Sequence, residues 1–273
     1  MSDSSMTYFL PVAGLDALIS ALQSSGYKTV APLERDGAVL WSEIASSKEL
    51  PKDRRDDQQP GSYRLTDADT GYFGMNHGHQ SLKSLTFKAR ESLVRFTRDE
   101  SGIHFEPSMP QVESIAVIGA RACDVAGLNM QRQVFENGAY PDLHFRQHRE
   151  NLFIVTVNCI HAQPTCFCAS MQTGPRARSG FDVALTPVPD GFLLECGSEA
   201  GEQLSGRLAL SGTTSAQTEQ ADAAMAACAA SQSRSLPDMQ SCQTLSARQE
   251  HPHWQDVANR CLSCGNCTMV CPT

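Results

Sequence analysis

Ser114-Ile-Ala-Val-Ile-Gly119 is a short apolar run that ends at a glycine, a pattern typical of a buried strand. Asn151-Leu-Phe-Ile-Val-Thr-Val-Asn158 has the same character, and residues 125–135 between the two runs place apolar side chains at helical spacing. A strand–helix–strand order implies a right-handed crossover, which makes the two strands parallel. These segments therefore predict an α/β fold built on a sheet with flanking helices.

The flanking segments extend the predicted sheet into a mixed one. We expect strands over residues 8–10, 28–32, 38–44, 180–186 and 191–196, and helices over residues 15–22 and 221–230. The last two strands are predicted to form a hairpin at a Pro-Asp-Gly turn. The charged residues 46–61 are expected to form a solvated loop. A boundary near residue 240 divides the chain into an α/β domain, residues 1–240, and a C-terminal domain, residues 241–273.

Composition narrows the class of protein. The 273 residues carry 22 Lys and Arg against 30 Asp and Glu, a net charge of −8 that argues against nucleic acid as a partner. No apolar stretch reaches the roughly 18 residues of a membrane span, and the N-terminus lacks the basic region of a secretory signal. Because the 11 cysteines are clustered rather than dispersed, metal ligation explains them better than disulfides. We therefore expect a cytoplasmic metalloprotein.

The C-terminal segment carries four cysteines at the spacing C-x2-C-x2-C-x3-C-P. Bacterial ferredoxins hold a 4Fe-4S cluster with this spacing. Gly265 would let the backbone approach the cluster closely, and Pro272 would turn the chain away from it. Zinc sites usually place their second cysteine pair further along the chain, so we favour iron–sulfur ligation. The predicted ligands, called the terminal cysteine run below, are Cys261, Cys264, Cys267 and Cys271.

In two-cluster ferredoxins the fourth cysteine of such a run ligates the other cluster. The sequence stops at Thr273 before any second run, so residues 241–273 are predicted to be the incomplete start of a 4Fe-4S ferredoxin-type domain. We therefore expect either a fragment of a longer protein or a cluster completed by a cysteine elsewhere.

A second group of cysteines follows the two central strands. Because parallel strands end at the same edge of a sheet, Cys123 and Cys159 are predicted to face one crevice at the carboxyl edge. Asp124 could cap the helix that follows Cys123. Pro164-Thr-Cys-Phe-Cys168 adds two thiols directly afterwards. The sequence predicts a second cluster here, with zinc or no metal as the alternatives. The predicted ligands, called the central cysteine set, are Cys123, Cys159, Cys166 and Cys168. His144, His148 and His161 could each replace a ligand, whereas Cys196, Cys228 and Cys242 are interpreted as structural.

Several of these segments resemble one protein family. They are Gly119-Ala-Arg-Ala-Cys-Asp124, residues 149–159, Pro164-Thr-Cys-Phe-Cys-Ala-Ser-Met171 with Gly174-Pro175, residues 181–186 and the terminal cysteine run. The family is the iron–sulfur β subunit of cytoplasmic sulfhydrogenase-type nickel–iron hydrogenases, which is similar to the 4Fe-4S dicluster component of anaerobic sulfite reductases. The resemblance is distinctive over residues 115–200 and 255–272.

The resemblance implies a function and its partners. Members of this family carry electrons between a catalytic partner and a flavin-bearing, nicotinamide-reactive subunit. We therefore expect one to three 4Fe-4S clusters, flavin-bearing, small and catalytic partner subunits, and no catalysis by this chain itself. The family also carries a second ferredoxin run, which this sequence lacks. A structural zinc module for protein–protein contact is the alternative, and a redox enzyme acting at the crevice between Cys123 and Cys168 is a third hypothesis.

Overall fold

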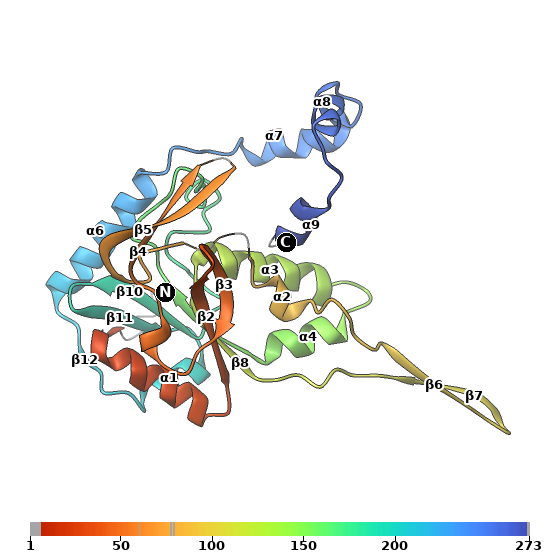
Figure 1. The fold of residues 1–273 in the computed structure, drawn as a ribbon, viewed down its shortest axis with the longest axis horizontal. Coiled ribbons are helices and arrows are strands. Elements are labelled where there is room, and N and C mark those ends of the chain that lie inside the picture. Colours follow the sequence, from red (N-terminus) through yellow and green to blue (C-terminus); the bar gives the residue numbers. More distant parts are fainter. Residues whose placement is uncertain (1–6, 60, 77, 79, 272–273) are drawn as a thin grey trace.

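The computed structural model describes residues 7–271 except residues 60, 77 and 79 (Figure 1). Its main element is an eight-stranded sheet with the order β12-β1-β11-β10-β9-β8-β2-β3. In that order the strands are Ser211–Gly212, Thr7–Pro11, Gly191–Cys196, Val183–Val188, Leu152–Val157, Ile115–Ala120, Lys28–Arg35 and Ala38–Glu43.

The centre of the sheet is parallel and its edges are antiparallel. Strands β2, β8, β9 and β10 run in one direction, and Ile115 of β8 lies opposite Leu152 of β9. Strand β3 pairs antiparallel with β2 on one side, while β11, β1 and β12 add antiparallel pairs on the other. The predicted α/β fold with a mixed sheet and flanking helices is confirmed, including the β10–β11 hairpin.

Both faces of the sheet are buried under apolar clusters. Successive strand residues point to opposite sides, so each central strand contributes to both clusters. In β8, Ala116 and Ile118 join the apolar cluster that includes α1 (Leu15–Ser24), whereas Ile115 and Val117 join the cluster that includes α3 (Ala122–Glu136). Burying each large aliphatic side chain contributes about 1.5–3 kcal/mol relative to leaving it in water. This two-sided burial explains why the central strands are continuous apolar runs in the sequence.

The other helices of the body include three short ones that connect strands and the longer α6, which follows the last strand. They are α2 (Lys83–Thr86), α4 (Leu143–Glu150), α5 (Glu199–Ser205) and α6 (Ser215–Ala230), with 3₁₀ turns η1 (Val12–Gly14) and η2 (Ser47–Glu49). Helix α6 follows β12 and packs against β10 and β11. In the described part of the chain, no helix has the length and apolar character required to cross a membrane.

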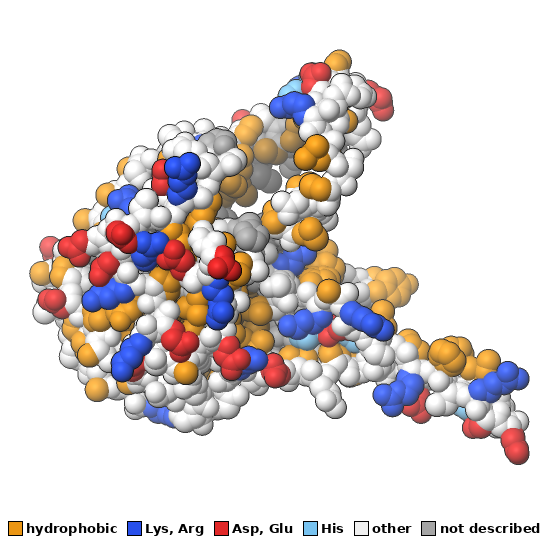
Figure 2. All heavy atoms as spheres, in the orientation of Figure 1, with side chains coloured by type: hydrophobic (Ala, Val, Ile, Leu, Met, Phe, Trp, Pro, Cys, Tyr) orange, Lys and Arg blue, Asp and Glu red, His pale blue; other side chains and the backbone are white. Residues whose placement is uncertain are grey.

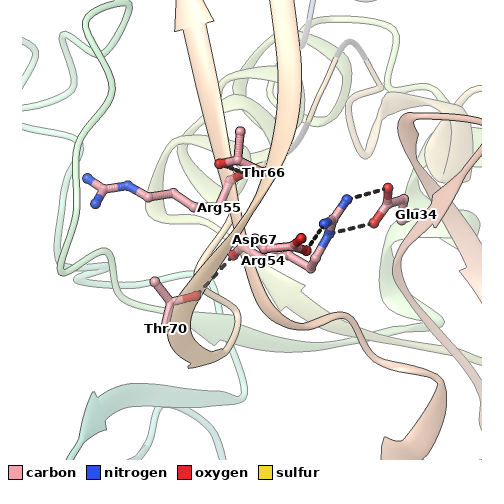
Figure 3. A network of polar contacts seen from close by, with 6 residues as sticks. All are labelled: Glu34, Arg54, Arg55, Thr66, Asp67 and Thr70. Carbon is pink, nitrogen blue, oxygen red and sulfur yellow. Dashed lines mark hydrogen bonds and ion pairs between the residues drawn. The ribbon is translucent and has the colours of Figure 1, made fainter.

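Residues 46–61 are not the solvated loop that their charge predicted. They include strand β4 (Lys52–Gln59), which pairs antiparallel with β5 (Ser62–Tyr72) in a ribbon outside the main sheet. Arg54 ties this ribbon to β2, because its Nε and Nη2 donate to the two carboxylate oxygens of Glu34 at 2.8 and 2.7 Å (Figure 3). Arg54 also pairs with Asp67 of β5. The two strands pair through their backbones and are mostly polar and at least partly solvent-exposed, so the sequence carries no apolar alternation and looked like a loop.

Two segments extend away from the body of the molecule (Figure 1). One is the hairpin of β6 (Val94–Asp99) and β7 (Gly102–Pro107), which forms a separate two-stranded sheet. The other, called the C-terminal arm below, carries α7 (Met239–Gln243), η3 (Thr244–Arg248), α8 (His253–Asn259) and α9 (Asn266–Val270). The space-filling view shows both standing off from the body (Figure 2). The arm begins close to the predicted boundary at residue 240, although a separate domain there stays a prediction.

Candidate functional site

A cavity of about 280 Å³ lies beyond the carboxyl ends of β8 and β9, where α/β sheets commonly bind ligands. All four members of the central cysteine set line it. Cys123 comes three residues after the end of β8, and Cys159 comes two residues after the end of β9. The parallel pairing of these strands therefore brings both thiols to one cavity. The crevice predicted from strand order is present.

Cys123 lies in the first turn of α3. Arg121 is the N-cap residue of this helix, and its backbone N–H donates to Asp124 Oδ2 at 2.7 Å. Asp124 is therefore the third residue of the helix and not the cap that its sequence position suggested. Its carboxylate accepts this hydrogen bond within the first turn of the helix, and the neighbouring Cys123 lines the cavity.

Backbone hydrogen bonds position Cys159 and Cys166. The N–H of Cys159 donates to the carbonyl of Pro175 at 3.2 Å, and its thiol donates to Asn76 Oδ1 at 3.8 Å. Cys166 lies in a tight turn, in which its N–H donates to the Gln163 carbonyl at 2.9 Å. The N–H of Gln163 in turn donates to Cys166 Sγ at 3.3 Å. Amide donors to sulfur of this kind favour a thiolate over a thiol.

Cys168 is held between Gln232 and Gly174. Gln232 Nε2 donates to Cys168 Sγ at 3.3 Å, and Gln232 Oε1 accepts from the Ala169 N–H at 3.0 Å. One side chain thus links the loop that carries Cys166 and Cys168, called the cysteine loop below, to the end of α6. A Cβ on Gly174 would lie 2.8 Å from Cys168 Sγ. Glycine is therefore the residue that leaves this thiol its space. The Gly174–Pro175 peptide bond is cis.

Burial favours the neutral form of the Cys123 and Cys159 thiols. Burial raises the pKa of Cys159 to about 11 and that of Cys123 well above its ordinary value, with the Asp124 charge adding to the second shift. Cys123 is exposed where it lines the cavity, but the protein atoms around its sulfur remove much of the water that would stabilise a thiolate. Such thiols become thiolates only when a cation compensates them, and a metal ion does so by displacing their protons.

One fixed cation lines the same cavity. The Arg121 side chain is buried, with 4% of its surface exposed. Its Nη2 donates to the carbonyls of Phe73 and Met75 at 2.7 and 2.5 Å, and its Nη1 donates to that of Val157 at 3.4 Å. Within the described residues its buried Nε has no hydrogen-bond partner. Soft thiol donors beside a buried guanidinium suit an anionic iron–sulfur–thiolate group in donor type and in charge.

The thiols line the wall of the cavity without converging on one point. Across the described ranges, no group of three or more His, Cys, Asp or Glu side chains is arranged as a metal site. Ligation of iron by the central cysteine set therefore stays a prediction.

The terminal cysteine run occupies the end of the C-terminal arm. Ser263 and Gly265 have positive φ angles of 54° and 72°, which turn the chain sharply between α8 and α9. Cys261, Cys264 and Cys267 are exposed, and Cys271 is partly buried. Val270, one residue before Cys271, lines the central cavity. The end of this run therefore lies against the central site, a proximity that no local sequence pattern indicates.

Cys228 was missed as a site residue by sequence reasoning. It belongs to α6, is buried, and lines the central cavity as a fifth thiol. Burial raises its pKa to about 12. Its alanine-rich helix offers no ligand spacing, so only the packing of α6 beside the cysteine loop identifies it.

The three histidines considered as substitute ligands lie in two different places. His161 lines the cavity, and burial, together with the charges of Arg55 and Arg121, lowers its pKa. His144 and His148 lie on α4, where both contact Glu91.

Known proteins share part of this sequence. No family model matches the chain. It is 30% identical over 159 residues to "Sulfhydrogenase 2 subunit beta" of Pyrococcus furiosus, an alignment that covers 58% of this chain and 47% of that protein. The chain thus spans about half the length of this curated relative. The similarity is therefore to part of a sulfhydrogenase β subunit.

Proposed function

We propose that the chain is an iron–sulfur electron-transfer subunit of a multi-subunit oxidoreductase of the hydrogenase or sulfite and sulfur reductase type. The observation that carries the proposal is the cavity in which Cys123, Cys159, Cys166 and Cys168 surround a space bordered by the buried Arg121. These cysteines are brought together by the ends of two parallel strands and the following loop, an arrangement that local packing alone does not require.

Each side chain has a defined role in this proposal. The central cysteine set and the terminal cysteine run hold iron through their sulfur atoms. Iron–sulfur clusters, when bound, accept and release single electrons at potentials set by charge, hydrogen bonds and solvent exposure. The Gln163 N–H and Gln232 Nε2 donate hydrogen bonds to the sulfurs of Cys166 and Cys168, and so stabilise their negative charge.

The position of Val270 supports a relay between the two sites. Because Val270 lines the central cavity and precedes Cys271, the terminal cysteine run ends beside the central cysteine set. Iron held by both groups of cysteines would then lie at neighbouring sites, between which an electron could pass.

We propose that other subunits complete the electron path. The relative is named as a subunit, which supports a multi-subunit assembly. A flavin-bearing, nicotinamide-reactive subunit would exchange electrons with one site, and small and catalytic subunits would exchange electrons with the other.

Metal analysis and EPR spectroscopy of anaerobically purified protein test the proposal. We expect iron and acid-labile sulfide in similar amounts, and an EPR signal after dithionite reduction. Serine substitutions at Cys159 and Cys264 should remove the central and the terminal signal separately. Cys242→Ser is the matched control, because Cys242 lies on α7 outside both groups and should leave the metal content unchanged.

Two outcomes would contradict the proposal. About one zinc per chain without sulfide would instead indicate the structural zinc module. Iron that survives both Cys159→Ser and Cys264→Ser would show that other groups hold it. Cys228→Ala, tested alongside, decides whether the fifth thiol belongs to the central ligands.

A further inference from the structure

The site leaves one buried charge unexplained. Arg121 is the residue between the end of β8 and the first residue of α3, and its side chain lines the central cavity. An arginine buried to this degree normally pairs with a carboxylate, because an unpaired charge in a protein interior is costly. In the described part of the chain its guanidinium makes no ion pair, and its three hydrogen bonds all go to neutral carbonyls.

The three carbonyls also fix where the charge lies. Phe73 and Met75 belong to the segment after β5, and Val157 is the last residue of β9. Arg121 is thus held from two sides and cannot swing out to solvent. Its Nε–H has no acceptor among the described residues, and the cavity that it borders is lined by thiols. The guanidinium charge therefore lies where it would stabilise an anion held in the cavity.

We propose that Arg121 is the fixed countercharge of the central cavity, which stabilises the reduced form of an iron–thiolate group held there and raises its reduction potential. The inference rests on the proposed function. On reduction one electron enters from the donor, no bond forms or breaks, and the negative charge in the cavity grows by one. A guanidinium at fixed position is attracted more strongly to the reduced form than to the oxidised form, so it favours reduction.

Redox titration followed by EPR tests the role with three variants. Arg121→Gln removes the charge but keeps a donor, whereas Arg121→Lys keeps the charge. Arg149→Gln is the matched control, because Arg149 is also largely buried with an Nε that lacks a partner among the described residues, but it does not line the cavity. Iron and sulfide contents are measured on each variant beforehand.

We expect Arg121→Gln to bind iron as the unchanged protein does. At the midpoint potential of the unchanged central site, its ratio of reduced to oxidised form should fall at least tenfold, which is about 59 mV for a one-electron couple. Arg121→Lys should change the ratio less than threefold. Arg149→Gln should leave it unchanged, and the terminal site should keep its potential in all three variants.

The other outcomes are equally decisive. Iron-loaded Arg121→Gln with an unchanged central potential overturns the role. If Arg121→Gln folds but binds no central iron while Arg121→Lys does, the charge is needed for loading, which supports the countercharge. If both fold and neither binds iron, Arg121 acts only through its hydrogen-bond geometry, and the inference fails. If Arg121→Gln does not fold, the ratio of reduced to oxidised form in Arg121→Lys decides. A tenfold or larger change in that ratio would overturn the role of Arg121, and a change below threefold would support it.

Failure of the proposed function looks different. It would be seen in the unchanged protein itself, which would then contain no iron that Cys159→Ser removes. No variant of Arg121 is needed to detect it.

Discussion

At the scale of single residues, the central site depends on a glycine that leaves space for a thiol and on neutral carbonyls that hold an arginine. The Cys168 sulfur occupies space that any side chain at position 174 would fill. Arg121 is held by backbone carbonyls that bring no compensating charge. Both residues belong to the same short segments as the cysteines, and both shape the space and the charge around those thiols.

Gly174→Ala tests the space around Cys168. The added Cβ would lie 2.8 Å from the sulfur and 3.1 Å from the Cβ of Cys168, so the thiol must move. We expect the variant to fold, with loss of most of the iron at the central site and retention of that at the terminal site. Metal analysis with EPR measures this.

Gly138→Ala is the control for this substitution, because its added Cβ would meet nothing closer than 3.8 Å. Normal central iron in Gly174→Ala would show that the Cys168 thiol takes no part in binding.

Glu91 links stability to pH. Burial raises its pKa, but hydrogen bonds from His148 (2.5 Å) and His144 (3.3 Å) outweigh burial and lower it overall. A carboxyl group whose pKa is lower in the folded state adds stability above its unfolded pKa, near 4.5, and loses that contribution as the pH falls through its folded pKa. Glu91→Gln should therefore cost about 1–3 kcal/mol at pH 7, and less as the pH falls below about 4.5.

Urea unfolding across this pH range measures the effect. Glu219→Gln, an exposed position on α6, should change the unfolding free energy little at any pH. A Glu91→Gln penalty that stays constant down to about pH 3 would show that the carboxylate charge is not responsible.

At the scale of elements, the β6–β7 hairpin is the part least tied to the core. Phe96 and Phe105 lie opposite each other, with ring centroids 6.4 Å apart, and each is 71% exposed. The apolar residues Val94, Ile103 and Pro107 lie on the same face, because alternate residues of a strand share one side. Figure 2 shows apolar side chains gathered along this projection. A lone two-stranded hairpin is only marginally stable in water.

Alanine substitutions at Phe96 and Phe105 should therefore leave the body unaffected. We expect the double variant to change the free energy of unfolding by less than about 0.5 kcal/mol, as surface substitutions usually do. Phe145→Ala is the matched control, because Phe145 is 1% exposed and its loss should cost about 3–5 kcal/mol. Chemical denaturation followed by circular dichroism compares them, and a cost above about 1 kcal/mol for the double variant would mean that the hairpin packs on the body.

At the scale of the whole molecule, the body and the C-terminal arm contribute differently. Helices α8 and α9 contain no buried residue, and Leu262 between them is 90% exposed. The segment before the arm is attached to the cysteine loop instead, through Arg234 Nε to the Pro164 carbonyl and the Leu236 N–H to Ser170 Oγ. The stability of the body should thus be independent of the arm.

Truncation after Pro237 tests this independence. The shortened protein keeps the attachment of residues 234 and 236, so its unfolding free energy should match that of the full chain to within about 1 kcal/mol. Because Val270 is removed from the wall of the cavity, a chelator should extract iron from the central site faster than from the full chain. Equal extraction rates would show that the arm does not shield the cavity, and a large loss of stability would show that it belongs to the folded core.

Much of the fold was predictable because its signals are local. The apolar runs of β8 and β9 and the helix between them required a parallel pair with a shared edge, and that edge carries Cys123 and Cys159. The β4–β5 ribbon was missed because its strands are mostly polar and at least partly solvent-exposed, which leaves no apolar period.

The sequence by itself determined the α/β class, the strand order around the central crossover, the ligand spacing of the terminal cysteine run and the crevice that Cys123 and Cys159 share, because periodicity and spacing act over a few residues. Only the tertiary structure decided that Cys228, Val270 and the buried Arg121 border the same cavity. These residues come from α6, the C-terminal arm and the end of β8, and they meet through packing between elements far apart in the chain. Such packing depends on how whole faces fit together, which leaves no pattern within any one segment.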